Sequence, residues 1–184
     1  LGVVGTFSRL SGGRLAWMGA FVAAVAPWFE GAPRFLARLA AARPFRDEST
    51  LFARAAAIAA TMPEGEQLEL IDAHPRLGAP PGTVSALSYH EQGYDRGAGT
   101  ADDALVDVAA ELERLNAAYE ARFGFRYCVF VAGRPRAALL PGFAAALRPD
   151  VDREAELHRA LDAVVDIAID RQRTPTRAAV EAST

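Results

Sequence analysis

The chain has 184 residues, of which 51% are apolar, and this length and composition suit one domain with a single hydrophobic core. Charged residues make up 23% and the net charge is −3, without a basic run, so we expect a small-molecule ligand and no nucleic-acid or membrane partner. All 20 basic side chains are Arg, and the absence of Lys excludes a pyridoxal Schiff base and a P-loop phosphate site.

The first apolar stretch, residues 15–29, follows Arg9 and Arg14 in the manner of a secretory signal. It has no convincing cleavage site and is too short and too interrupted to span a bilayer, so we expect a cytoplasmic protein. Met18 is a candidate start residue. We expect three regions: an N-terminal extension that is disordered or not native at 1–17, the domain at 18–174 and a C-terminal tail at 175–184.

Apolar residues recur with the period of a helix along the whole chain, which predicts an all-α, single-domain multi-helix bundle. Helices are expected in the first half of the chain at residues 15–29, 33–42, 50–61 and 66–73. Pro27, Pro44 and the Pro63-Glu64-Gly65 turn separate them. The stretch from His74 to Ser88 is rich in Pro and Gly and predicts an ordered loop, the kind of segment in which functional residues concentrate.

The second half predicts two long helices. The first runs from Ala101 to Arg122 and ends at Gly124. One buried stripe is expected along it: Leu105, Val108, Leu112, Leu115 and Tyr119. The second runs from about Asp152 to Arg173 and stops before Pro175. Its apolar face is expected to contain Leu157, Leu161, Val164 and Ala168. Residues 127–131 resemble a strand, but a solitary strand cannot build a sheet.

Arg171 falls on the apolar face of the last predicted helix. A guanidinium there either extends past the helix end to reach water or meets an anion in a pocket. The pattern alone favours the first interpretation.

His74 lies at the end of a predicted helix, because the Pro75 that follows it disfavours the α conformation. The carbonyl end of a helix favours the protonated imidazole, which would suit a proton donor. The alternative is a histidine that caps or packs, and among three histidines chance favours that alternative.

Ser88 and Glu91 have the Ser-x-x-Glu spacing of a capping box, in which both side chains satisfy free amides at a helix start. A metal site remains an alternative for the titratable residues His74, His90, His158, Glu91 and Asp95. No close His pair places two ligands on one helical face, so we predict no metal. His158 is expected on the surface, and Cys128, the single cysteine, is expected to pack in the core.

Six motifs in order resemble those of the 2-oxo-4-hydroxy-4-carboxy-5-ureidoimidazoline (OHCU) decarboxylases. They are Phe29-Glu30, Arg43-Pro44-Phe45, His74-Pro75-Arg76-Leu77-Gly78, Ser88 to Gln92, Asn116 to Phe125 and Arg171. The likeness covers roughly residues 18–174. It implies an all-α fold and a homodimer, with decarboxylation that needs no cofactor.

The resemblance also implies roles for site residues. His74 would be the catalytic acid or base, Glu91 would act beside it and Arg171 would hold a substrate anion. The implied substrate-binding residues are Pro75, Ser88, Gln92, Tyr127, Cys128, Val129, Phe130 and Val131. The reaction would release carbon dioxide from the ureidoimidazoline and give (S)-allantoin, with the ring imine taking the electrons.

The sequence departs from the family pattern at three places. Arg126 stands where the family has Pro, Pro33-Arg34 stands where the family often has Pro-Trp, and Gly93-Tyr94-Asp95 replaces Ala-Gly-Leu, so Tyr94 or Arg126 could reshape the pocket. Two alternatives stay open: a diverged relative acting on another small ureido or carboxylate compound, and a non-catalytic helical binding module. Whether Arg148 shares the anion-binding role of Arg171 also stays open.

Overall fold

The computed structural model describes residues 14–92 and 102–173, and within these ranges the regular structure is entirely helical. The α-helices are α2 (Arg14–Val25), α3 (Pro33–Ala41), α4 (Glu48–Thr61), α5 (Glu64–Asp72), α6 (Ala86–Glu91), α7 (Asp102–Phe123), α8 (Arg136–Ala146) and α9 (Arg153–Arg173). Two short 3₁₀ helices are η1 (Ala26–Phe29) and η2 (Pro81–Thr83). The all-α prediction is confirmed. Residues 93–95, where the sequence departs from the family pattern, lie outside the described residues.

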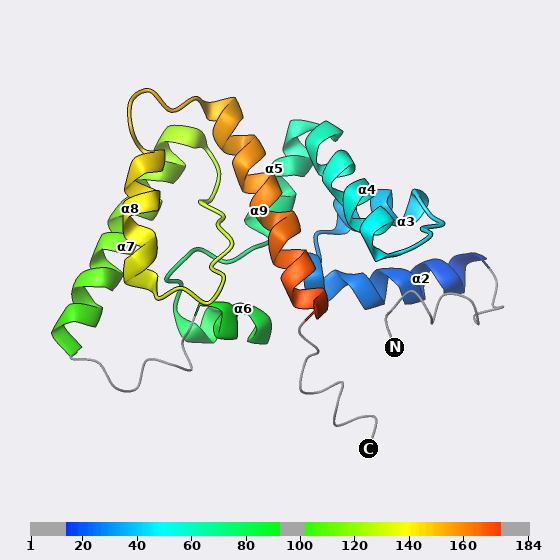
Figure 1. The fold of residues 1–184 in the computed structure, drawn as a ribbon, viewed down its shortest axis with the longest axis horizontal. Helices are drawn as coiled ribbons and strands as arrows, with labels where there is room; N and C mark the ends of the chain where they lie inside the picture. The colour runs from blue at the N-terminus through cyan, green and yellow to red at the C-terminus, as the bar shows by residue number, and fades with distance from the viewer. Residues whose placement is uncertain (1–13, 93–101, 174–184) are drawn as a thin grey trace, which may run out of the picture.

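Helix α9 runs through the middle of the structure, between α7 and α8 on one side and α3, α4 and α5 on the other (Figure 1). It packs against α4, α5 and η1. The predicted apolar face of this helix is buried as expected, and His158 is exposed as expected. Because α9 lies near the end of the chain and packs against elements from its first half, it can join residues that are distant in sequence into one site.

The predicted helix at 15–29 is two elements. Helix α2 ends at Val25, and η1 follows with Pro27 near its start, because proline lacks the amide hydrogen that a continuing α-helix needs. Helix α2 begins at Arg14, four residues before the expected domain boundary. The rest of the predicted extension and the tail from 174 onward lie outside the described residues, so the division into extension, domain and tail stays a prediction.

Helix α8 is absent from the sequence-based expectations. Pro141 and Gly142 interrupt its pattern, and both are usually poor helix formers. Both are exposed, while Leu139 and Phe143 are buried. Packing of this buried face against α7 outweighs the unfavourable local propensity.

Residues 127–131 have no regular secondary structure and pair with no strand in the described part of the chain. The ring of Tyr127 stacks on Phe143 with centroids 3.8 Å apart. The guanidinium of Arg159 in α9 lies over the Tyr127 ring, 4.7 Å from its centroid. This segment is therefore held by side chains from α8 and α9 instead of by a sheet.

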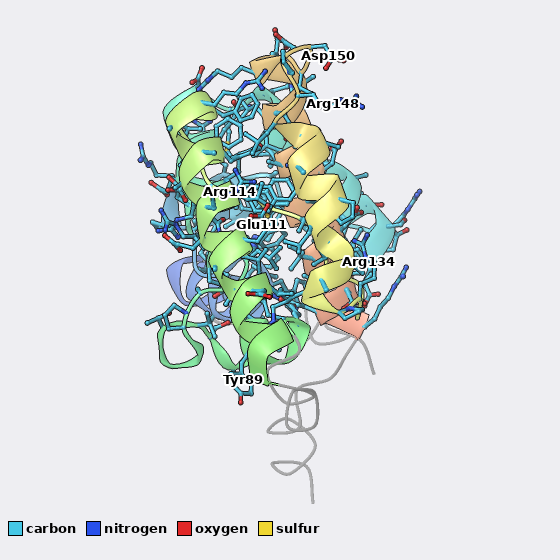
Figure 2. The ribbon with its side chains drawn as sticks, turned by 90° about the vertical axis from the view of Figure 1, so that its left-hand side faces the viewer. Tyr89, Glu111, Arg114, Arg134, Arg148 and Asp150 are labelled. Carbon is cyan, nitrogen blue, oxygen red and sulfur yellow. The ribbon has the colours of Figure 1, made fainter. Side chains whose placement is uncertain are left out.

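Arg148 is placed away from α6. It is exposed in the α8–α9 connection and lies 3.5 Å from the carboxylate of Asp150. Figure 2 shows this pair at one end of the molecule and Tyr89 of α6 at the other. Arg148 therefore does not share the surroundings of Arg171, which settles the question left open by the sequence.

No helix in residues 14–92 and 102–173 is long and apolar enough to cross a membrane. A cavity of about 540 Å³ opens between α4 and α9, lined by apolar residues such as Phe52 and Val165. Neither His74 nor Glu91 lines this cavity, and neither does Arg171.

Candidate active site

His74 lies directly beyond α5, as Pro75 predicted, and its side chain is buried with only 4% of the residue exposed. The loop that follows turns at Gly78, whose φ is +83°. A Cβ at Gly78 would lie 2.9 Å from Cδ1 of Leu112 in α7. The loop therefore packs directly on α7, and glycine at this position permits both the turn and the close approach.

The imidazole of His74 has a defined tautomer. Nδ1 lies 3.1 Å from the carbonyl oxygen of Leu70, and since a carbonyl only accepts, Nδ1 carries the hydrogen. Nε2 is buried and has no hydrogen-bond partner among residues 14–92 and 102–173. In the neutral ring Nε2 is a free acceptor, which is the form of histidine that takes a proton.

Burial and then the charge of Arg171 lower the pKa of His74 to about 4, against the opposing effects of the bond to Leu70 and the charge of Glu30. The expectation that the end of α5 favours a protonated imidazole is therefore wrong. Removal from water destabilises the protonated imidazole more than the carbonyl end of the helix stabilises it. At neutral pH His74 is a base.

Arg171 of α9 is buried, with 4% of the residue exposed, and it meets two carboxylates. Its Nε lies 2.6 Å from Oε1 of Glu91, and its Nη2 lies 2.8 Å from Oε2 of the same residue. Nη2 also donates to Oε1 of Glu30 at 2.8 Å and to Oγ of Ser88 at 3.0 Å. A paired guanidinium of this kind is fixed in orientation by its fork of donors.

The third nitrogen of Arg171, Nη1, donates to the carbonyl oxygens of Pro27 at 3.0 Å and Trp28 at 3.4 Å. Every guanidinium nitrogen thus has an acceptor within the protein. The interpretation that Arg171 reaches past the helix end to water is wrong, because the side chain turns inward to anions. In this structure those anions belong to the protein itself, and a contact between Arg171 and a substrate anion stays a prediction.

Glu30 is a site residue that the sequence analysis named only as part of a motif. It follows η1 with φ of +50°, a conformation that few residues other than glycine adopt without cost. Oε1 of Glu30 accepts hydrogen bonds from Ser85 at 2.8 Å and Ser88 at 2.7 Å. The strained backbone places this carboxylate on Arg171 and on α6 at once.

Burial alone would raise the pKa of Glu30, but the charge of Arg171 and hydrogen bonds from Ser88, Ser85 and Arg171 outweigh it and hold that pKa below its usual value. Glu30 is therefore ionised at neutral pH. Together with Glu91 it places two carboxylates around one guanidinium, beside a neutral imidazole.

The predicted capping box is wrong. Ser88 lies inside α6, and the hydroxyl of Ser85 accepts the backbone N–H of Ser88 at 3.1 Å. Ser85 thus does the capping, three residues earlier than the sequence pattern indicated. This frees Ser88 and Glu91 to bond to Glu30 and Arg171 instead.

Gln92 connects α6 to the loop that carries His74. Its Oε1 accepts the N–H of Gly78 at 2.8 Å, and its Nε2 donates to the carbonyl of Arg76 at 3.1 Å. Asn116 of α7 adds a bond from Nδ2 to the carbonyl of Leu77 at 3.0 Å, while its buried Oδ1 has no partner in the described part of the chain. The neighbours Glu91 and Gln92 therefore tie Arg171 and the His74 loop to the same short helix.

Residues 127–131 form another part of these surroundings. Tyr127, Cys128 and Val131 are buried, whereas Val129 and Phe130 are half-buried. Burial raises the pKa of the Cys128 thiol to about 12, and the nearby charges of Arg159 and Arg171 only partly oppose this. Cys128 is a buried core residue, as expected, and a neutral thiol.

A second ion pair anchors the same segment. Nη1 of Arg159 donates to the carbonyl of Cys128 at 2.8 Å, and its Nε donates to Glu156 at 2.9 Å. Glu156 also accepts the hydroxyl of Tyr119 at 2.8 Å. Helix α9 therefore holds residues 127–131 through Arg159, and it holds the carboxylates of Glu30 and Glu91 through Arg171.

Among residues 14–92 and 102–173, no three His, Cys, Asp or Glu side chains are placed to hold a metal ion together. Asp95, one of the candidate ligands, lies outside these ranges. The substrate-binding roles of Pro75, Ser88, Gln92 and residues 127–131 stay predictions.

Comparison with known proteins agrees with this arrangement. The family model described as OHCU decarboxylase matches residues 18–173. The chain is 33% identical over 140 residues to the uric acid degradation bifunctional protein PucL of Bacillus subtilis (strain 168), covering 76% of this chain and 27% of that protein. The chain thus spans about a quarter of the length of this curated relative.

A solved structure shares the fold. It is described as the crystal structure of OHCU decarboxylase in the presence of (S)-allantoin, and it superposes with a TM-score of 0.59 at 21% sequence identity, covering 77% of this chain and 89% of that one. The family match extends over nearly all of the described residues and includes His74, Glu91 and Arg171. This chain belongs to the OHCU decarboxylase family.

Proposed function

We propose that this protein catalyses the cofactor-independent decarboxylation of 2-oxo-4-hydroxy-4-carboxy-5-ureidoimidazoline to (S)-allantoin in urate degradation. The observation that carries this proposal is the buried, neutral His74, whose Nε2 can accept a proton. His74 lies near the group that Arg171 forms with Glu30, Ser88 and Glu91. Membership of the family supports the choice of substrate.

The chemistry follows from the substrate and from the tautomer of His74. The bond between the ring and its carboxylate breaks, and the electron pair enters the adjacent ring C=N, whose nitrogen takes a proton from solvent. Nε2 of His74 accepts the proton of the ring hydroxyl and returns it to the neighbouring ring carbon from one face. One carboxylate and one proton thus give carbon dioxide and a single enantiomer, and His74 ends neutral as it began.

The carboxylate cluster has a part in this scheme. Arg171 fixes the two oxygens of Glu91, so Glu91 offers acceptors in a constant place for the N–H groups of the ureido chain. In this scheme Glu91 touches the substrate, and Arg171 positions Glu91.

Freshly generated substrate tests the proposal. The protein is expected to give (S)-allantoin faster than the spontaneous reaction, which yields the racemate. Circular dichroism follows the enantiomer, and released carbon dioxide gives the rate. Racemic product at the background rate from folded protein would leave a non-catalytic binding module as the better description.

The pH profile gives a second prediction. Lowering the pH from about 7.5 to about 6 is expected to leave kcat/KM nearly unchanged, because the pKa of His74 is lowered to about 4 and Nε2 stays unprotonated. A histidine with the ordinary pKa of about 6.5 would lose most of its base form over this range. An acid limb centred near pH 6.5 would contradict the assignment.

Stability provides a check on the same group. The unfolded chain takes up the His74 proton near pH 6.5, whereas the folded chain does so only near pH 4, so this contribution to stability is present above pH 6.5 and is lost as the pH falls toward 4. Urea unfolding midpoints for the protein and a His74→Asn variant measure it. The midpoint of the protein should fall relative to that of the variant as the pH drops from 6.5 to 4.

The cytoplasmic location and the homodimer remain parts of the proposal. The family resemblance supports a dimer, and sedimentation of the purified protein tests it.

A further inference from the structure

We propose that Arg126 is a positioning residue for His74. This inference rests on the proposed function. Nη1 of Arg126 donates to the carbonyl oxygen of His74 at 3.1 Å and to that of Asp72 at 2.6 Å. The backbone N–H of Arg126 also donates to Oδ1 of Asp72 at 3.3 Å. Arg126 therefore bonds both to the end of α5 and to the main chain of His74, the proposed base.

The other contacts of His74 explain why this hold matters. Its N–H donates to the carbonyl of Ile71, and its ring donates to the carbonyl of Leu70, so both bonds lead back into α5. Both bonds fix His74 relative to α5. Arg126 adds a hydrogen bond that ties the His74 main chain to the segment that follows residue 126.

That segment begins directly after Arg126. Residues 127–131 have no regular secondary structure, and they are the residues whose backbone is predicted to line the substrate. Since Arg126 bonds to the His74 backbone, it sets the separation between the imidazole and residues 127–131. A proton transfer depends on such a separation to within about 1 Å, and misplacement of that size can cost about 10²-fold in rate.

The chemistry of the residue fits this duty. A guanidinium can cap several carbonyls at a helix end at once, which the last carbonyls of α5 require. Proline, which the resembled family has here, could make neither the side-chain bonds nor the amide bond to Asp72. Arg126, which replaces the proline of the family pattern, is thus the residue that joins His74 to residues 127–131.

The test is Arg126→Met, with Arg122→Met as the matched control. Arg122 also caps carbonyls, those of Leu147, Arg148, Pro149 and Val151, but it does so in the α8–α9 connection. Arg126 is only half-buried, so both variants are expected to fold. Thermal unfolding records what each loses in stability.

The expected result is a fall of about tenfold in kcat for Arg126→Met with KM changed less than twofold, and partial recovery in Arg126→Lys, because the reacting groups are misplaced while binding remains. Arg122→Met should keep kcat within twofold at a similar loss of thermal stability. Equal kcat for the two variants would overturn the proposal, as would a normal kcat in Arg126→Met.

A readout without turnover separates this inference from the proposed function. NMR signals of the His74 imidazole are expected to shift in Arg126→Met, since the main chain that carries the ring loses its bond to the guanidinium, and to stay unchanged in Arg122→Met. If the unaltered protein proves inactive, the proposed function fails, and these signals alone decide the role of Arg126. Unchanged His74 signals in Arg126→Met would then overturn it.

Discussion

Replacing His74 with asparagine is expected to lower kcat by about 10²- to 10⁴-fold and to abolish the excess of one allantoin enantiomer, while the protein remains folded. Asparagine can keep a donor on the carbonyl of Leu70, so the local fold is preserved, but it offers no group that both takes and returns a proton. Initial rates with freshly generated substrate, corrected for the spontaneous reaction, measure the loss.

The matched control for this change is His158→Asn. His158 is exposed on α9, so its replacement should leave rate and enantiomer excess unchanged. If His74→Asn kept turnover near that of His158→Asn, another group would have to move the proton.

Arg171→Met is expected to have the largest effect on stability, a loss of about 3–5 kcal/mol, because removing one member of a buried ion pair leaves its partners' charges without compensation. The side chain of Arg171 is 2% exposed, and Glu30 and Glu91 are 13% and 23% exposed. Urea denaturation at pH 7.5 gives the free energy of unfolding. Loss of activity should accompany it, since Glu91 loses the partner that fixes it.

Two further variants show whether charge is the cause. Adding Glu30→Gln and Glu91→Gln to Arg171→Met should recover a large part of the lost stability, because the uncompensated carboxylates are then gone. Arg114→Met breaks the exposed pair with Glu111 on the outer side of α7 and should cost no more than about 1 kcal/mol (Figure 2). A triple variant no more stable than Arg171→Met would mean that packing, and not charge, explains the loss.

Much of the fold could be predicted from local pattern. The apolar face of α9 and the end of α5 before His74 follow from periodicity and from Pro75, which act within a few residues. Helix α8 could not be predicted, because Pro141 weakens the local signal and the packing of Phe143 against distant residues restores the helix.

The sequence could name candidate site residues, but it could not predict their contacts. The resemblance named His74, Glu91 and Arg171, yet the partners of Arg171 lie 80 and 141 positions away along the chain. Periodicity carries no information over such distances. The tautomer of His74 likewise depends on which neighbour accepts its hydrogen, and the backbone of Glu30 adopts a conformation that its residue type does not announce.

Both Arg159 and Arg171 lie on α9, so the length of this helix sets the distance between the two parts of the candidate active site that they hold. Arg159 and Arg171 are twelve residues apart, which at 1.5 Å per residue is about 18 Å along the helix. Adding a single residue between them would turn one about 100° relative to the other, since a helix has 3.6 residues per turn. The segment at 127–131 and the two carboxylates would then lose their common reference, so we expect α9 to accept substitutions on its outer side far more readily than any change in its length.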